Sequence, residues 1–154
     1  VALSYSALTN IELCKQIGDV IGYQSVVVVI DVKKKNFFGG YDLYSHNGTK
    51  KSKWNMFDFI AKLEEIGIGE IVINSIDNDG TMQGYDIPLL ESIREKCSMP
   101  ITVLGGAGSL EEIKKIISKF KTIGVSAGSL FVFKGKYRAV LINYPNRQER
   151  LKLY

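Results

Sequence analysis

The 154-residue sequence is poor in the residues that build disulfide scaffolds and metal centres. It has two cysteines and one histidine, and Cys14 and Cys97 do not have the spacing of metal ligands. Both cysteines fall in predicted helices, so we expect buried, reduced thiols and a cytoplasmic protein. His46 falls in a predicted hairpin, where we expect it to be exposed. The sequence therefore predicts no metal site and no cofactor.

Long apolar runs are also absent. No segment approaches the roughly 20 apolar residues that a membrane-spanning helix needs. Residues 1–7 are apolar, but they are too few for a signal peptide and lack a basic leader. We expect no membrane association, and a start at Val1 without methionine suggests a processed, truncated or partly observed chain.

The charge balance is mildly basic, with 20 Lys and Arg against 16 Asp and Glu and a net charge of +4. Lysines gather at residues 33–35 and 50–53, in predicted loop or hairpin regions. No aromatic side chains alternate with them as in readers of single-stranded nucleic acid. Nucleic acid is therefore not expected as a partner. A solvated surface and the steering of a phosphorylated substrate both remain open.

Apolar segments alternate along the chain between strand-like runs and helix-like stripes. A composition that is 45% hydrophobic and 23% charged fits a single domain over residues 1–154, with a frayed tail at 145–154. Strands are predicted within 1–7, at 25–30, from 71, at 101–104 and at 122–126. Helices are predicted at 8–21, 54–66, 86–99 and 109–120, with short helical pieces at 130–133 and 137–142. A hairpin is predicted at 37–48.

Strict alternation of strands and helices predicts an α/β fold with parallel strands and right-handed crossovers. Two closures are open, namely a doubly wound sheet and part of a (β/α) barrel. No G-x-G-x-x-G motif follows the first complete strand, which argues against dinucleotide binding. Glycine-rich loops after the last two strands favour the barrel, because barrel phosphate sites often form there.

Two glycine-containing segments suit phosphate binding. The run Gly105-Gly106-Ala107-Gly108 precedes a predicted helix, where exposed N–H groups can bind an anion. Gly128-Ser129 follows the last predicted strand and could supply further donors. A tight turn without a ligand is the alternative interpretation.

Three carboxylates follow predicted strands and could act as a general acid or base. Asp31 follows six apolar residues at the end of one strand, and Asp77 and Asp79 follow the next strand. In a barrel these residues would lie at the same rim. For Asp77 and Asp79, hydrogen bonding within an Asp-Asn-Asp-Gly turn is the alternative.

Four motifs together resemble the cyclase subunit of imidazole glycerol phosphate synthase. They are Val-Ile-Asp31, the segment 75–86, Gly105-Gly-Ala-Gly108 and Ala127-Gly-Ser129. The resemblance covers nearly the whole chain and implies the C-terminal half of a (β/α)8 TIM barrel, from part of strand 4 through helix 8. Strands one to three would lie outside this sequence.

The resemblance also implies an activity. In that family a glutaminase subunit forms a heterodimer with the cyclase and supplies ammonia through the barrel. The ammonia reacts with a bis-phosphorylated ribulosyl-formimino carboxamide ribonucleotide. The products are imidazole glycerol phosphate, for histidine biosynthesis, and an aminoimidazole carboxamide ribotide.

The resemblance assigns roles to individual residues. Asp31 matches one of two catalytic aspartates, and the other belongs to the first strand of the barrel. The phosphate-binding residues it implies are Asp79 and Gly80 at one site and Gly105, Gly106, Gly128 and Ser129 at a second. Glu70 matches part of a charged gate where ammonia enters at the floor of the barrel.

Departures from the family pattern leave other functions open. Asn74 replaces the usual threonine and Leu104 the usual serine, and residues 3–6 lack the usual Asn-Thr pair. The segment 131–145 looks like that of a paralogous subgroup that serves amidination of surface-polysaccharide sugars. A non-catalytic, phosphate-binding half-barrel is a third alternative. We also expect self-association through exposed edges at residues 26–30 and 122–126.

Overall fold

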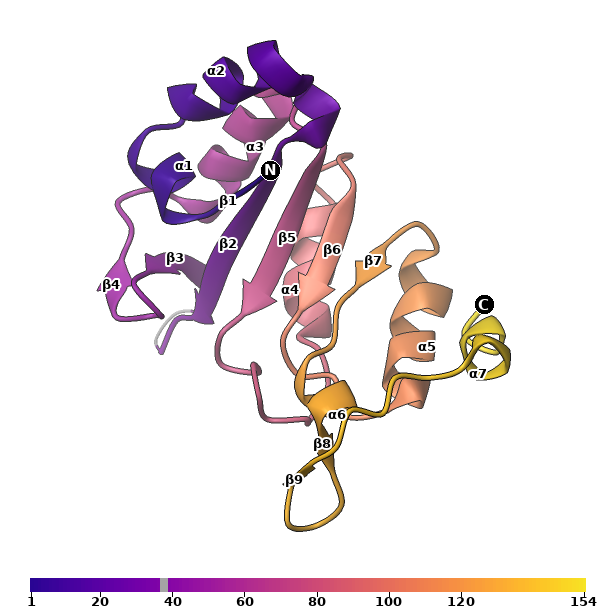
Figure 1. Ribbon diagram of the computed structural model, residues 1–154. Helices are drawn as coiled ribbons and strands as arrows, with labels where there is room; N and C mark the ends of the chain where they lie inside the picture. The colour runs from indigo at the N-terminus through magenta and orange to yellow at the C-terminus, as the bar shows by residue number, and fades with distance from the viewer. Residues whose placement is uncertain (37–38) are drawn as a thin grey trace.

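The computed structural model describes residues 1–36 and 39–154, and its centre is a sheet of parallel strands (Figure 1). Each strand pairs with the next in the order β1, β2, β5, β6, β7, and all four pairings are parallel. The strands are β1 (Ala2–Leu3), β2 (Val27–Lys34), β5 (Glu70–Ser75), β6 (Ile101–Leu104) and β7 (Gly124–Val125). Sequential order with helical crossovers agrees with the barrel-type arrangement rather than a doubly wound sheet.

Helices cover one face of this sheet, and Figure 1 shows α3 and α4 lying behind it. Side chains of β5, and of β2 as far as Lys33, alternate between buried and half-buried positions, so one face packs against helices and the other is more open. The crossover helices are α2 (Glu12–Ile21), α3 (Met56–Ile66), α4 (Ile87–Arg94) and α5 (Leu110–Phe120). Asp31 and Asn74 occupy half-buried positions on the open face.

A hairpin extends the sheet beyond β2, as the sequence predicted. Strand β3 (Tyr41–Ser45) pairs antiparallel with the last residues of β2, and β4 (Lys50–Lys51) pairs antiparallel with β3. The predicted hairpin included Phe37, which lies outside the described residues. His46 and Asn47 adopt positive φ angles of 53° and 55° in the turn, and His46 is exposed as expected.

Side-chain caps begin three of the crossover helices, α3, α4 and α5. The Asn55 side chain accepts hydrogen bonds from the backbone at the start of α3. Asp86 caps α4, which has Pro88 in its first turn, and Ser109 caps α5. The helix starts predicted at Asp86 and Ser109 are therefore confirmed. The predicted helix from Asp86 is shorter than expected, because α4 ends at Arg94 and leaves Cys97 outside it.

The N-terminal predictions need correction. The strand expected within residues 1–7 is only Ala2–Leu3, because the chain turns into helix α1 (Tyr5–Thr9). The helix expected at 8–21 is two helices, and α2 begins after Ile11 without a side-chain cap from Thr9 or Asn10. The strand expected to end at Asp31 continues to Lys34, because β3 supplies hydrogen-bonding partners there.

The C-terminal predictions also need correction. The last parallel strand is two residues rather than five. The predicted helix at 137–142 is wrong, because β8 (Phe133–Lys134) and β9 (Ala139–Val140) form a hairpin after the short helix α6 (Ser129–Val132). The tail that we expected to fray contains α7 (Arg147–Leu151), which a capping box at Asn146 begins.

The core lies between the sheet and its helices. Val26, Val28 and Ile30 are fully buried, and β2 has strand neighbours on both sides, so residues 26–30 are not the exposed edge we expected.

Cys14 and Cys97 are free and buried, as expected. No helix within the described residues is both long and apolar enough to cross a membrane.

Candidate functional site

The carboxyl ends of β2, β5, β6 and β7 meet at one rim of the sheet, and the predicted site residues lie there with one exception. On β2, Asp31 stands opposite Asn74 of β5 in the strand register. Asn74 Nδ2 donates a hydrogen bond of 2.8 Å to Asp31 Oδ1. The carboxylate therefore has a fixed partner on the neighbouring strand.

The loop after β5 is held by its own polar side chains. The Asp77 carboxylate accepts a hydrogen bond of 2.9 Å from the backbone N–H of Lys34. The Asn78 amide donates to the carbonyl of Gly84 at 2.8 Å. Asp77 thus ties this loop to the end of β2, which favours the structural interpretation of this residue over a catalytic one.

The Gly105-Gly106 pair lets the loop after β6 approach the loop after β5. Both glycines have positive φ angles, 97° and 104°. A Cβ at Gly106 would lie 2.0 Å from the carbonyl oxygen of Gly84, and one at Gly105 would lie 2.6 Å from that of Ser75. The fold itself therefore requires glycine at both positions.

One small hollow at the rim is lined by all six residues that the sequence predicted for phosphate binding. They are Asp79, Gly80, Gly105, Gly106, Gly128 and Ser129. The resemblance implied two separate phosphate sites, but here both groups face the same hollow. A Cβ at Gly128 would meet no atom within 4 Å, so this glycine borders open space.

Backbone donors are available beside this hollow. Within the described residues, the N–H groups of Gly106, Gly128 and Ser129 donate no hydrogen bond to another protein group. At the start of α5, in contrast, the N–H of Gly108 donates to the Glu112 carboxylate at 2.7 Å. An anion would therefore bind on the Gly106 and Gly128 side, away from the repulsion of Glu112.

Tyr85 joins the loop after β5 to the loop after β7. Its hydroxyl donates a hydrogen bond of 3.0 Å to the carbonyl of Ser126. Burial, with a smaller contribution from the charge of Glu112, raises the pKa of Tyr85 well above its usual range. The phenol therefore stays neutral and remains a donor that braces the wall of the hollow.

Glu70 is the exception to the shared rim. It begins β5, opposite Val27, and so lies at the other end of the sheet from Asp31. The predicted position at the start of a strand is confirmed, and the predicted role in ammonia entry stays a prediction.

Sequence reasoning missed two residues that contact the site. Asn74 was noted only as a departure from the family pattern, although a polar residue after Ile71-Val72-Ile73 in a buried strand is itself a signal. Arg138, from the loop between β8 and β9, donates a hydrogen bond of 3.0 Å to the carbonyl of Gly80. No sequence pattern pointed to that contact.

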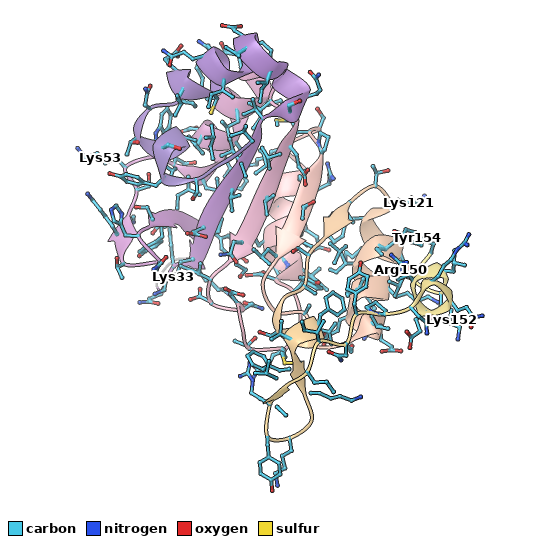
Figure 2. All side chains as sticks on the ribbon, viewed as in Figure 1. Lys33, Lys53, Lys121, Arg150, Lys152 and Tyr154 are labelled. Atoms are coloured by element: carbon cyan, nitrogen blue, oxygen red, sulfur yellow. The ribbon has the colours of Figure 1, made fainter. Side chains whose placement is uncertain are left out.

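Several basic side chains lie on two opposite sides of the molecule. Figure 2 shows Lys33 and Lys53 on the hairpin side and Lys121, Arg150 and Lys152 on the opposite, C-terminal side. Within the described ranges, no cluster of three or more His, Cys, Asp or Glu side chains could hold a metal ion.

The strand order, the helical crossovers and the polar rim define a class of protein, the (β/α) barrels that carry their sites at the carboxyl ends of the strands. A family model described as "Histidine biosynthesis protein" matches residues 1–138, and the chain belongs to this family. Family and sheet order together confirm the predicted α/β fold as half of a (β/α)8 barrel.

Individual relatives carry related names. The chain is 47% identical over 154 residues to "Putative imidazole glycerol phosphate synthase subunit HisF" of Leptospira interrogans, and it covers 61% of that protein. It is 45% identical over 152 residues to "Putative imidazole glycerol phosphate synthase subunit hisF3" of Vibrio vulnificus, covering 99% of this chain and 58% of the relative.

A third relative is more distant. The chain is 37% identical over 131 residues to "Imidazole glycerol phosphate synthase subunit HisF" of Streptococcus sanguinis, covering 85% of this chain and 52% of the relative. The chain thus spans 52% to 61% of the length of these relatives.

Proposed function

We propose that this chain supplies the catalytic rim of an ammonia-dependent cyclase of the imidazole glycerol phosphate synthase type, a lyase of histidine biosynthesis. The observation that carries the proposal is the rim itself, where Asp31 of β2 shares one edge of the parallel sheet with a glycine-lined hollow that has available N–H donors. The loops after β5, β6 and β7 form this hollow. The family membership and the names of the relatives support the same reaction class.

Each part of the rim has a chemical task in this proposal. Asp31 is the general acid or base that exchanges a proton with the reacting nitrogen centre. The N–H groups of Gly106, Gly128 and Ser129 bind one phosphate of a bis-phosphorylated substrate. Gly105 permits the close approach of the loop after β6 to the loop after β5. Asp79 and Gly80 line the same hollow and position its outer wall.

Ammonia would come from a glutaminase subunit in a heterodimer. Glu70 lies at the end of β5 opposite the rim, which suits a gate that admits ammonia at the floor of the barrel. We propose a cytoplasmic enzyme, in keeping with the two free, buried cysteines.

The test uses the intact protein that carries this chain. Turnover of the ribulosyl-formimino substrate is measured with ammonium chloride, and again with glutamine and the glutaminase. We expect both nitrogen sources to support turnover, and Glu70→Ala to reduce only the glutamine-driven reaction. Absence of turnover with ammonium, while phosphate still binds, would reject the histidine-pathway reaction and leave either an enzyme with another substrate or a non-catalytic phosphate-binding protein.

A second candidate is a paralogous enzyme that uses ammonia to amidinate a surface-polysaccharide sugar. It is favoured by the sequence identities of the relatives. The Leptospira and Vibrio relatives, both named "putative", are 45–47% identical to the chain, whereas the Streptococcus relative, named without that word, is 37% identical. Complementation of a histidine auxotroph separates the two candidates. Failure to complement, together with an acetamidino-sugar defect in a deletion strain, would select the paralogue.

A further inference from the structure

The Asn74 side chain makes one hydrogen bond and also has a buried oxygen without a partner. Its Nδ2 donates to Asp31 Oδ1 at 2.8 Å, and its Oδ1 is buried without a hydrogen-bond partner among the described residues. An ionised carboxylate only accepts hydrogen bonds, so the amide nitrogen must face Asp31. The oxygen is therefore forced to point away from Asp31.

The unpartnered oxygen is unfavourable for folding. A buried acceptor loses its hydration, and no protein donor among the described residues replaces it here. An apolar residue of similar volume at position 74 would remove this cost and pack on the same strand. The sequence nevertheless has a carboxamide there, so its advantage must come from the contact with Asp31 rather than from stability.

Asn74 also lies between the two halves of the site. It pairs in register with Asp31 of β2 on one side and with Leu104 of β6 on the other. A Cβ built at Gly105 would lie 3.4 Å from Asn74 Oδ1, so the amide oxygen packs against the first glycine of the loop that lines the hollow. The side chain thus spans the distance between the carboxylate and the glycine loop.

We propose that Asn74 is a positioning residue that holds the Asp31 carboxylate toward the ligand bound in the glycine-lined hollow. The inference rests on the proposed function only in assigning Asp31 to the reaction. Asn74 acts through Asp31, because its N–H fixes the orientation of one carboxylate oxygen and leaves the other free.

Three variants of the intact protein separate positioning from a structural role. Asn74→Leu removes the donor and the unpartnered acceptor together, so we expect an unchanged or higher midpoint of urea unfolding. Turnover with ammonium should fall about tenfold to a hundredfold, the factor that a hydrogen bond to a charged group represents. Asn74→Thr keeps a donor and should recover most of the turnover.

The matched control is Asn10→Leu, which makes the same substitution at an exposed asparagine remote in sequence from the rim. It should leave turnover unchanged. A parallel loss of stability and turnover in Asn74→Leu, or no rescue by Asn74→Thr, would overturn the inference. Normal turnover in Asn74→Leu would overturn it as well.

A readout without turnover separates this inference from the proposed function. In wild-type protein, the NMR signals of the Asn74 side-chain amide should move as acid protonates Asp31. Those of Asn78, whose amide donates to Gly84 instead, should not follow the same transition. Asn74 signals that ignore the transition would refute the contact even in an active enzyme. Signals that follow it in an inactive protein would support the contact and reject the activity.

Discussion

The glycines at the rim should separate into those that the fold needs and one that a ligand needs, and Gly128→Ala tests this distinction. Gly128 has a φ of −106°, which any residue adopts, and a Cβ there would meet no atom within 4 Å. Gly106 has a φ of 104°, and a Cβ there would lie 2.0 Å from the carbonyl oxygen of Gly84. The same added methyl group thus enters open space at one site and the backbone at the other.

The expected magnitudes differ accordingly. Gly128→Ala should change the free energy of unfolding by no more than about 0.5 kcal/mol. Its methyl group would occupy space beside the N–H donors of the hollow, and loss of one hydrogen bond to an anion should weaken phosphate binding about tenfold to a hundredfold. Gly106→Ala combines an unfavourable backbone conformation with a steric clash, so it should lose about 2–5 kcal/mol of stability. That is a large part of the roughly 5–15 kcal/mol that a domain has.

The assay measures urea unfolding and titration with inorganic phosphate on the same samples. Gly67→Ala is the matched control, because Gly67 has a positive φ of 80° but a Cβ there would meet no atom within 4 Å. It should lose about 1 kcal/mol and keep full phosphate affinity. Wild-type phosphate affinity in Gly128→Ala would refute the phosphate site, and wild-type stability in Gly106→Ala would refute the account of the loop contact.

Three further substitutions test the rim and the pH dependence of the fold. Asp31→Asn should lower ammonium-driven turnover by about 10²- to 10⁴-fold without loss of the fold, and unchanged turnover would remove Asp31 from the mechanism. Burial, together with a 2.9 Å hydrogen bond to Asp86, raises the pKa of Tyr41. The stabilising effect of the neutral phenol is therefore present at neutral pH, and it is lost as the pH rises above the ordinary tyrosine pKa of about 10. Tyr41→Phe should lose about 0.5–1.5 kcal/mol at neutral pH and show a shallower alkaline decline in urea-unfolding stability, and an unchanged slope would contradict this. Hydrogen bonds from the Ser98 hydroxyl and backbone lower the pKa of Glu64. The contribution of Glu64 to stability is therefore present above the ordinary pKa of 4.5 and lost as the pH falls. Glu64→Gln should reduce the loss of stability at acidic pH, as measured by thermal melts.

Local signals in the sequence predicted most of the regular structure. Apolar runs identified β2, β5 and β6, and the caps at Asp86 and Ser109 identified the starts of two helices. The segment 137–142 was misread because Val140-Leu141-Ile142 is apolar without a clear period. The deciding feature was a turn in which Gly135 and Arg138 adopt positive φ angles, 72° and 49°, and an arginine gives little warning of such a conformation.

The candidate site was predictable only in part, because its residues meet through the sheet register. The sequence indicated Asp31 and the glycine loops separately, since each follows a recognisable strand. It could not indicate that Asn74 stands opposite Asp31, because that contact depends on how β2 and β5 align. It also could not indicate that Asp79 and Gly80 share a hollow with Gly128, since their loops follow strands separated by β6.

Some residues at the rim are needed for folding, and others are not. Gly105 and Gly106 are required where they are by close backbone contacts, so their presence alone says little about a ligand. Close backbone contacts do not require Gly128 or Asn74. Gly128 borders open space, and Asn74 has a buried oxygen without a hydrogen-bond partner among the described residues. Neither residue is explained by folding, and the two lie on opposite sides of the glycine loop. A ligand whose phosphate is held beside Gly128 would therefore extend toward the carboxylate that Asn74 orients, which is the arrangement that a proton transfer by Asp31 requires.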